Sequence, residues 1–237
     1  MRITCIIPAY NEANRIADVL KVALDHPSLS EIIMVDDGST DGTAAQALEA
    51  SALYGHFQLI RHETNRGKSS AIATGIEEAT GDLLLFLDSD LKGLGLPAIS
   101  ALIKPVTEGD ADVALSLRRN APRLWHWLGV DYISGERIMP RALLSAHTET
   151  IRNLRGFGLE VFLNSLWIQQ NLRLSVVEWP AVESTPKWQK LGWLRGALAD
   201  MNMLADMFAT VGPTVALRQI KALRSQRITP RRRRFAH

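Results

Sequence analysis

The sequence of 237 residues contains a single cysteine, Cys5, which lies in an apolar run near its start. A lone cysteine excludes an intramolecular disulfide framework and fits a protein of a reducing compartment. No apolar run approaches the roughly 20 residues of a membrane-spanning helix. The opening MRITCIIPAYNE also lacks the long apolar core of a secretory signal. We therefore expect a cytoplasmic protein.

Three common signatures of cofactor and nucleotide binding are also absent. Histidine and cysteine residues do not cluster at zinc-binding spacing. No GxxxxGK[ST] phosphate loop is present, and PAYNE occupies the first strand–helix turn, where a dinucleotide-binding domain has its glycines. Zinc chemistry, P-loop nucleotide hydrolysis and dinucleotide binding are therefore disfavoured.

Acidic side chains are missing from the C-terminal end of the chain. Residues 218–237 hold eight Lys and Arg side chains and no Asp or Glu, whereas the preceding residues hold 19 basic and 25 acidic side chains. We therefore expect one domain over residues 1–217 and a basic tail over residues 218–237. Such a tail predicts attraction to an anionic membrane surface. The interleaved aromatic side chains and basic face of a nucleic-acid-binding protein are lacking, so no nucleic-acid partner is expected.

The first half of the chain alternates short apolar runs with segments of helical periodicity. This alternation predicts an α/β protein whose mainly parallel sheet carries helices on both faces. The expected strands cover residues 3–8, 31–35, 57–61, 83–87, 113–117 and 174–179. The expected helices cover residues 13–24, 43–53, 68–79, 97–106 and most of 156–169.

The second half of the chain is less regular. Residues 125–135, WHWLGVDYISG, combine aromatics and glycines and predict a shaped loop. Residues 191–223 have a largely helical pattern that Gly212 and Pro213 interrupt. An apolar, methionine-rich part of this segment, residues 201–208, predicts a contact with the core, with a membrane interface or with a second copy in a homodimer.

Polar clusters follow the strands at the points where the strands end. PAYNE follows the first strand, DDGSTDGT the second, NRGK the third and DSD the fourth. Because ligands of open α/β sheets bind at the carboxyl ends of the strands, we expect these clusters to share one crevice. Carboxylates that converge there raise one another's pKa unless a cation binds them. Mg²⁺ or Mn²⁺ together with substrate phosphates would supply that cation.

The NRGK cluster adds basic charge to the same edge of the sheet. Lys68 stands at the expected start of a helix, and both helix N-termini and basic side chains favour phosphate. Taken alone, NRGK is also typical of a capped surface turn. Its neighbours at the strand ends favour the phosphate interpretation.

Together the four motifs IIPAYNE, VDDGSTDGT, NRGK and FLDSD resemble those of the family-2 glycosyltransferases, which have the GT-A fold. The chain looks most like the dolichyl- and polyprenyl-phosphate sugar synthases of that family. The resemblance is strong over the first half and continues through ISGERIMPR and GFGLEVFL. It implies a Rossmann-like GT-A domain over residues 1–217 and a nucleotide-diphosphate sugar as donor.

The resemblance also implies roles for particular residues. FLDSD corresponds to the family's metal-binding DXD element, so Asp88 and Asp90 would hold Mg²⁺ or Mn²⁺ with Ser89 beside them. Asp90, Arg137 and Glu160 would be catalytic, with Arg137 facing a phosphate. Donor-binding residues would be Pro8, Tyr10 and Glu12 for the nucleoside, Val35, Asp36 and Asp37 for the base or ribose, and Lys68, Lys187 and Lys190 for the phosphates.

The acceptor is open between two chemical classes. A lipid phosphate is largely ionised near neutral pH, since its second pKa is about 6, and needs no general base. A hydroxyl acceptor needs a base, and Glu160 in GFGLE is the best candidate. Glu160 also fits a helix N-terminal carboxylate without a chemical role. The resemblance favours an inverting transfer to polyprenyl phosphate, made at the inner face of a membrane by a peripheral protein.

Two alternatives remain. The first keeps the enzyme class but takes a soluble hydroxyl acceptor, such as a glycan or a small organic acid, and includes a retaining transferase of the glucosyl-phosphoglycerate type. The second is a module that binds nucleotide sugars without turnover. The anomer of the product would distinguish the retaining transferase, and a donor-hydrolysis assay would distinguish the module.

Overall fold

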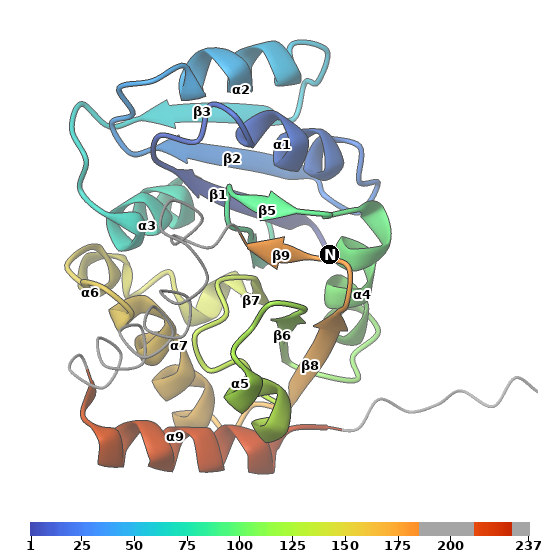
Figure 1. Ribbon diagram of the computed structural model, residues 1–237, viewed down its shortest axis with the longest axis vertical. Coiled ribbons are helices and arrows are strands. Elements are labelled where there is room, and N and C mark those ends of the chain that lie inside the picture. Colours follow the sequence, from blue (N-terminus) through green and yellow to red (C-terminus); the bar gives the residue numbers. More distant parts are fainter. Residues whose placement is uncertain (185–210, 229–237) are drawn as a thin grey trace, which may run out of the picture.

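The protein is built on a seven-stranded sheet with the strand order β3-β2-β1-β4-β7-β6-β8 (Figure 1). The computed structural model describes residues 1–184 and 211–228. Neighbouring strands are parallel except where β7 pairs with β4 and β6. The predicted mainly parallel α/β fold is therefore confirmed. The strands are β1 (Ile3–Ala9), β2 (Glu31–Asp36), β3 (Phe57–Arg61), β4 (Leu83–Phe86), β6 (Val113–Arg118), β7 (Arg137–Pro140) and β8 (Leu174–Trp179).

Helices cover both faces of the sheet because alternate strand residues feed two separate cores. Along β1, Cys5 and Ile7 enter one core and Ile6 enters the other. The first core packs against α1 (Ile16–Leu24), α2 (Thr43–Ser51) and α4 (Leu96–Thr107). The second packs against α3 (Lys68–Glu78), α5 (Arg123–Leu128), α6 (Thr148–Arg152), α7 (Gly158–Gln169) and α9 (Pro213–Gln226).

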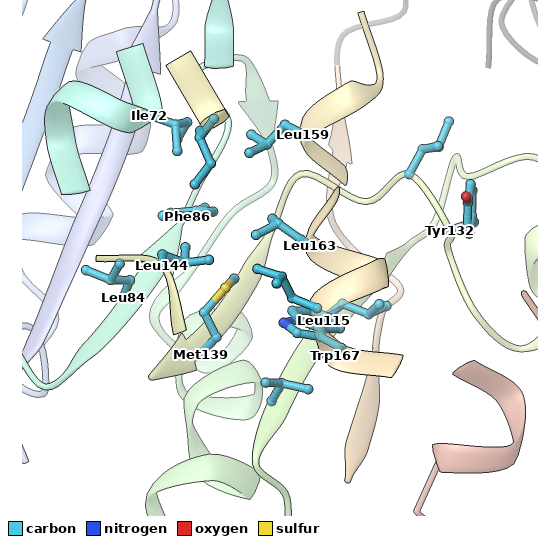
Figure 2. Close-up of a cluster of buried hydrophobic side chains, with 14 of the residues drawn as sticks. Ile72, Leu84, Phe86, Leu115, Tyr132, Met139, Leu144, Leu159, Leu163 and Trp167 are labelled. Carbon is cyan, nitrogen blue, oxygen red and sulfur yellow. The ribbon is translucent and has the colours of Figure 1, made fainter. Parts of the chain in front are cut away.

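Figure 2 shows part of the second core, where α3 and α7 meet the sheet. Ile72 of α3 and Phe86 of β4 lie across from Leu163 and Trp167 of α7, and all four are buried. This apolar contact fixes the starts of α3 and α7 beside the end of β4. Those three points carry the polar residues of the candidate site.

A second, two-stranded sheet extends the edge at which the main strands end. β5 (Leu91–Lys92) directly follows the DSD motif and pairs antiparallel with β9 (Glu183–Ser184). Asn120, two residues after β6, holds β9 in place: its side-chain amide donates to the carbonyl of Ser184 at 2.8 Å and accepts from the Ser184 amide at 3.2 Å. The pairing brings residues 183 and 184 next to the strand end that carries Asp90.

Several elements of the less regular half of the chain differ from the prediction, among them α5 and β7. The stretch expected to be a loop over residues 125–135 begins inside α5, which ends at Gly129 in the left-handed conformation, φ +69°. The strand β7 was not expected, because a run of four residues that begins with an arginine has no strand periodicity of its own. Its pairing with β4 and β6 is tertiary.

The expected helical segment over residues 191–223 is described only from residue 211 onward, where α9 begins at Pro213. Lys187, Lys190 and the methionine-rich residues 201–208 lie outside the described residues. None of the described helices combines the length and apolarity that crossing a membrane requires.

The helix α9 packs into the second core along one side. Ala216, Ile220 and Leu223 recur at helical spacing, and each is at most 5 % exposed. A domain boundary between residues 217 and 218 would divide this helix. The basic residues 218–226 are therefore the second half of a docked helix and not the start of a separate tail.

The packing of α9 predicts that the helix unfolds together with the domain. Leu223→Ala should lower the free energy of unfolding by about 2–5 kcal/mol, since it removes a buried leucine and leaves a cavity. Leu217→Ala, on the outward face of the same helix at 62 % exposure, should change it by less than about 0.5 kcal/mol. Urea denaturation of the wild type and the two variants measures both values. Equal stability of the two variants would show that α9 does not belong to the cooperative core.

Candidate active site

The ends of β1 and β4, the loop before β7 and the starts of α3 and α7 surround one crevice. Lys68, Asp88 and Glu160 line it together with Pro8 and the backbone of Gly135. Its apolar lining comes from Ile72, Phe86, Leu87, Leu159 and Leu163. The expectation that polar clusters share one edge of the sheet thus agrees with the structure.

Lys68 bridges two carboxylates in this crevice. Its Nζ lies 2.7 Å from Oδ1 of Asp88 and 3.3 Å from Oε1 of Glu160. Burial opposes the charge of Lys68, but the two carboxylates outweigh burial and raise the pKa of its ammonium above the ordinary value. Lys68 therefore stays protonated and links the end of β4 to the first turn of α7.

The two aspartates of the DSD motif differ in charge environment. Burial favours the protonated form of Asp88, but Lys68 and Arg118 lower its pKa below the ordinary value. For Asp90, burial together with the negative charges of Asp88 and Glu12 raises the pKa to about 6. A divalent cation beside Asp90 would favour its ionised form and lower that pKa again.

Arg118 is a site residue that the sequence pattern did not single out. Its Nη1 lies 3.2 Å from Oε1 of Glu136 and 3.8 Å from Oδ2 of Asp88, and its Nη2 lies 4.0 Å from Oδ2 of Asp131. Arg118 is the last residue of β6. The rule that functional side chains follow strand ends could have identified it.

Gly135 brings the loop after α5 into close contact with Asp88. A Cβ atom at this position would lie 2.5 Å from Oδ2 of Asp88. Only glycine therefore allows the backbone of the loop to approach the carboxylate so closely. In the same loop, Ser134 and Glu136 are fully buried, and Oε2 of Glu136 accepts a hydrogen bond from Ser116 Oγ at 2.6 Å.

Arg137 lies beside the crevice, but its guanidinium is fully buried and bonded within the protein. Nε donates to the carbonyl of Ser134 at 2.7 Å, Nη2 to the carbonyl of Tyr132 at 3.0 Å, and Nη1 to Oδ1 of Asn164 at 2.7 Å. The guanidinium also lies 4.9 Å from the ring centre of Trp167. Arg137 thus joins the loop to α7, and the phosphate contact that the family resemblance implied does not agree with this arrangement.

The hydrogen bonds of Asp36 and Asp37 also disagree with the predicted contact to base or ribose. Both are buried, and their carboxylate oxygens accept hydrogen bonds within the protein. Asp36 accepts from the Ser39 amide at 3.0 Å and from Nε of Arg61 at 3.0 Å. Asp37 accepts from the amides of residues 66 and 67 and from the ring of His62. Their role is to shape the turns that carry Ser39 and Lys68.

The PAYNE turn lies against the DDGSTDGT turn. The Asn11 amide donates to Oγ of Ser39 at 2.9 Å, and the Glu12 amide donates to Oγ1 of Thr43 at 2.8 Å. Tyr10 is 46 % exposed, and Glu12 forms an ion pair with Arg15. A nucleoside contact by Pro8, Tyr10 and Glu12 stays a prediction.

The predicted donor contacts of Val35 and Ser89 differ in how far each residue is exposed. The side chain of Val35 is fully buried in the second core, so it offers no surface to a nucleotide. Ser89, between the two aspartates, is 7 % exposed and is not among the residues that line the crevice, so a contact with the donor stays a prediction.

A divalent cation fits the charge balance of this site. Among the described residues, no three His, Cys, Asp or Glu side chains are placed to hold a metal by themselves. Asp88 and Asp90 therefore fit a metal whose remaining ligands come from a bound diphosphate. The described part of the chain brings together five carboxyl groups (Asp88, Asp90, Asp131, Glu136 and Glu160) and three cationic groups (Lys68, Arg118 and Arg137). The carboxyl groups outnumber the cationic groups, although burial raises the pKa of Asp131 and Glu136, and this imbalance favours the binding of a cation.

The chain belongs to glycosyl transferase family 2, whose model matches residues 4–152. It is therefore a glycosyltransferase, and the alternative of a module without turnover is set aside.

Solved structures of the same fold include glucosyl-3-phosphoglycerate synthase from Mycobacterium tuberculosis. One, in complex with Mn²⁺, UDP and glucosyl-3-phosphoglycerate, is 22 % identical, with a TM-score of 0.67 over 89 % of this chain and 80 % of that chain. Another, in complex with Mn²⁺, UDP-glucose and phosphoglyceric acid, is 20 % identical, with a TM-score of 0.65 over 88 % and 79 %. At these identities the likeness shows the GT-A fold.

The charge balance predicts that Asp90 is needed for binding of a metal–diphosphate unit. Asp90→Asn should weaken the Mn²⁺-dependent binding of a nucleoside diphosphate about 10-fold or more, because the variant loses an anionic oxygen ligand. Titration calorimetry with and without Mn²⁺ measures this affinity. Asp110→Asn, which changes an exposed residue before β6 at the other end of the strands, is the matched control and should bind like the wild type. Wild-type affinity in Asp90→Asn would remove Asp90 from the metal site.

Proposed function

We propose that this glycosyltransferase moves a sugar from a nucleoside-diphosphate sugar to a hydroxyl of a small acidic acceptor, with Mg²⁺ or Mn²⁺ bound at Asp88 and Asp90. One observation carries the proposal: the ammonium of Lys68 contacts Asp88 on one side and Glu160 on the other. Only the side chain of Lys68 therefore separates Glu160, which is suited to activate a hydroxyl, from Asp88, which is suited to hold the metal of the leaving diphosphate.

On the donor side, Asp88 and Asp90 would hold the metal ion, and Lys68 would contact the diphosphate. When bound, the metal would supply positive charge to stabilise the departing diphosphate. The side chain of Lys68 is 39 % exposed and follows Gly67, whose φ of +95° turns the chain into α3. Lys68 can therefore move from the two carboxylates to phosphate oxygens, at the helix N-terminus where anions are favoured.

On the acceptor side, Glu160 is the general base. Its carboxylate is buried in the first turn of α7 and lines the same crevice as Asp88. A hydroxyl nucleophile must lose a proton during the transfer, and a positioned carboxylate accepts it. The complexes of the M. tuberculosis synthase with phosphoglyceric acid support an acceptor that is small, acidic and soluble.

The base assignment gives the sharpest test of the acceptor class. Glu160→Gln should lower transfer to a soluble hydroxy acid about 10²- to 10⁴-fold, because the amide cannot take the proton. The Mn²⁺-dependent affinity for the nucleoside diphosphate should change little. Phosphoglyceric acid serves as the acceptor probe, and the anomer of the product reports whether the transfer is retaining or inverting.

Repeating the transfer assay with polyprenyl phosphate as the acceptor tests the other acceptor class. Glu149→Gln, which changes an exposed glutamate of α6 away from the crevice, is the matched control and should transfer like the wild type. If Glu160→Gln transferred sugar at the wild-type rate, and only to polyprenyl phosphate, the proposal of a soluble hydroxyl acceptor would be wrong.

A second candidate, transfer to polyprenyl phosphate at an anionic membrane, is favoured by a different observation. Arg218, Lys221 and Arg224 are exposed on the outward side of α9. On the neighbouring α5, Trp127 is 77 % exposed. Basic side chains near an anionic leaflet contribute about 1 kcal/mol each, and tryptophan favours the membrane interface.

This candidate predicts binding to anionic vesicles that salt weakens, because screening shortens electrostatic reach from about 10 Å at 0.1 M to about 3 Å at 1 M. Lys221→Glu should reduce co-sedimentation with anionic liposomes. Lys104→Glu, on α4 at the opposite face of the sheet, should not reduce it. Equal sedimentation of both variants and the wild type would contradict attachment through α9.

A further inference from the structure

The side chain of Gln219 on α9 connects two elements of the candidate site. Its Oε1 accepts a hydrogen bond from the hydroxyl of Tyr132, and its Nε2 donates to Oγ of Ser165 at 2.7 Å. Tyr132 lies in the loop that follows α5, and Ser165 lies in α7. Figure 1 shows α9 along one end of the molecule, beside α5 and α7.

The loop that follows α5 is also held at Tyr132 through hydrogen bonds to its backbone. The backbone carbonyl of Tyr132 accepts hydrogen bonds from Nη2 of Arg137 at 3.0 Å and from Nδ2 of Asn164 at 2.9 Å. Asn164 stands four residues after Glu160 on α7, so the two side chains share one face of the helix. Tyr132 is thus fixed to α7 through its backbone and to α9 through its hydroxyl.

The loop carries residues that shape the electrostatics of the site. Asp131 and Glu136 contact Arg118, which faces Asp88. The backbone at Gly135 lies directly against Asp88. A shift of the loop would therefore move Arg118 and Asp88 together, relative to Lys68 and Glu160.

We infer that Gln219 is a positioning residue of the transferase. It fixes the loop of residues 131–136 against α7, so that Arg118 and Asp88 keep their places around the diphosphate. The inference rests on the proposed function because it takes Arg118 and Asp88 to act on the donor. It makes α9 a part of the catalytic apparatus and not only of the core.

The effect on rate should exceed the effect on stability. A single hydrogen bond between neutral groups contributes only about 1 kcal/mol to folding. A misplacement of about 1 Å near reacting groups can lower a rate about 100-fold. A residue that is merely structural would instead lower stability and leave turnover by the folded protein unchanged.

The test uses three variants of α9 in the full-length protein. Gln219→Met keeps the side-chain volume but removes both hydrogen bonds, whereas Gln219→Glu keeps an acceptor for the Tyr132 hydroxyl. Leu217→Ala changes a residue of the same helix that is 62 % exposed and is the control. Turnover is measured as Mn²⁺-dependent hydrolysis of a nucleotide-sugar donor, which needs no acceptor, at a temperature well below every melting point.

We expect Gln219→Met to lower kcat for donor hydrolysis about 10-fold with less change in KM, while Gln219→Glu retains most of the wild-type kcat and Leu217→Ala retains all of it. Tyr132→Phe should give a loss similar to that of Gln219→Met, and the double variant should lose no more than either single variant, because both remove the same link. Wild-type kcat in Gln219→Met, or fully additive losses in the double variant, would overturn the inference.

Hydrogen exchange separates failure of this inference from failure of the proposed function. Amides of residues 131–136 should exchange faster in Gln219→Met than in the wild type and in Leu217→Ala, whether or not donor hydrolysis is detected. Faster exchange without donor turnover in the wild type would count against the proposed function alone. Unchanged exchange in Gln219→Met would overturn the positioning role.

Discussion

The structure depends on how negative charge is balanced at the carboxyl edge of the sheet. Five carboxyl groups of the described residues gather there against three cationic side chains, and burial makes the excess of negative charge unfavourable. Lys68 and Arg118 hold Asp88 ionised, while burial and the charges of Asp88 and Glu12 raise the pKa of Asp90 to about 6. A divalent cation and a diphosphate would stabilise such an edge, and that is the chemistry of a nucleotide-sugar donor.

The fold creates this edge by inserting one antiparallel strand into a parallel sheet. β7 runs against β4 and β6, so the beginning of β7 meets the ends of its neighbours, and Arg137 pairs with Phe86 in register. The loop that leads into β7 is therefore delivered to Asp88. The apolar contact between α3 and α7 then places Lys68 and Glu160 across from it. Core packing and site geometry are consequences of the same strand order.

The local sequence pattern was sufficient to predict the parallel strands and the convergence of Lys68 and Asp88. Each strand is an apolar run, and the polar residues of the site follow it directly in the sequence. It was insufficient for β7, whose pairing is tertiary, and for α9, whose buried side becomes visible only against α7.

The family resemblance brought Glu160 into the site, but it also assigned Asp37 and Arg137 to ligands, and both use their hydrogen bonds inside the protein. The charge of a motif residue does not show whether a ligand or another group of the protein binds its side chain. Gln219 was missed because its partners are distant in sequence, whereas Arg118, at the end of β6, could have been identified from its place in the strand.

Anomalous diffraction at the manganese edge, from crystals grown with Mn²⁺ and a nucleoside diphosphate, tests the charge-balance account most directly. The predicted result is one manganese peak at the carboxylates of Asp88 and Asp90, with the ammonium of Lys68 moved onto the diphosphate and Glu160 left facing the crevice. A manganese peak away from both aspartates, or a bound diphosphate with Lys68 still paired to Asp88 and Glu160, would contradict it.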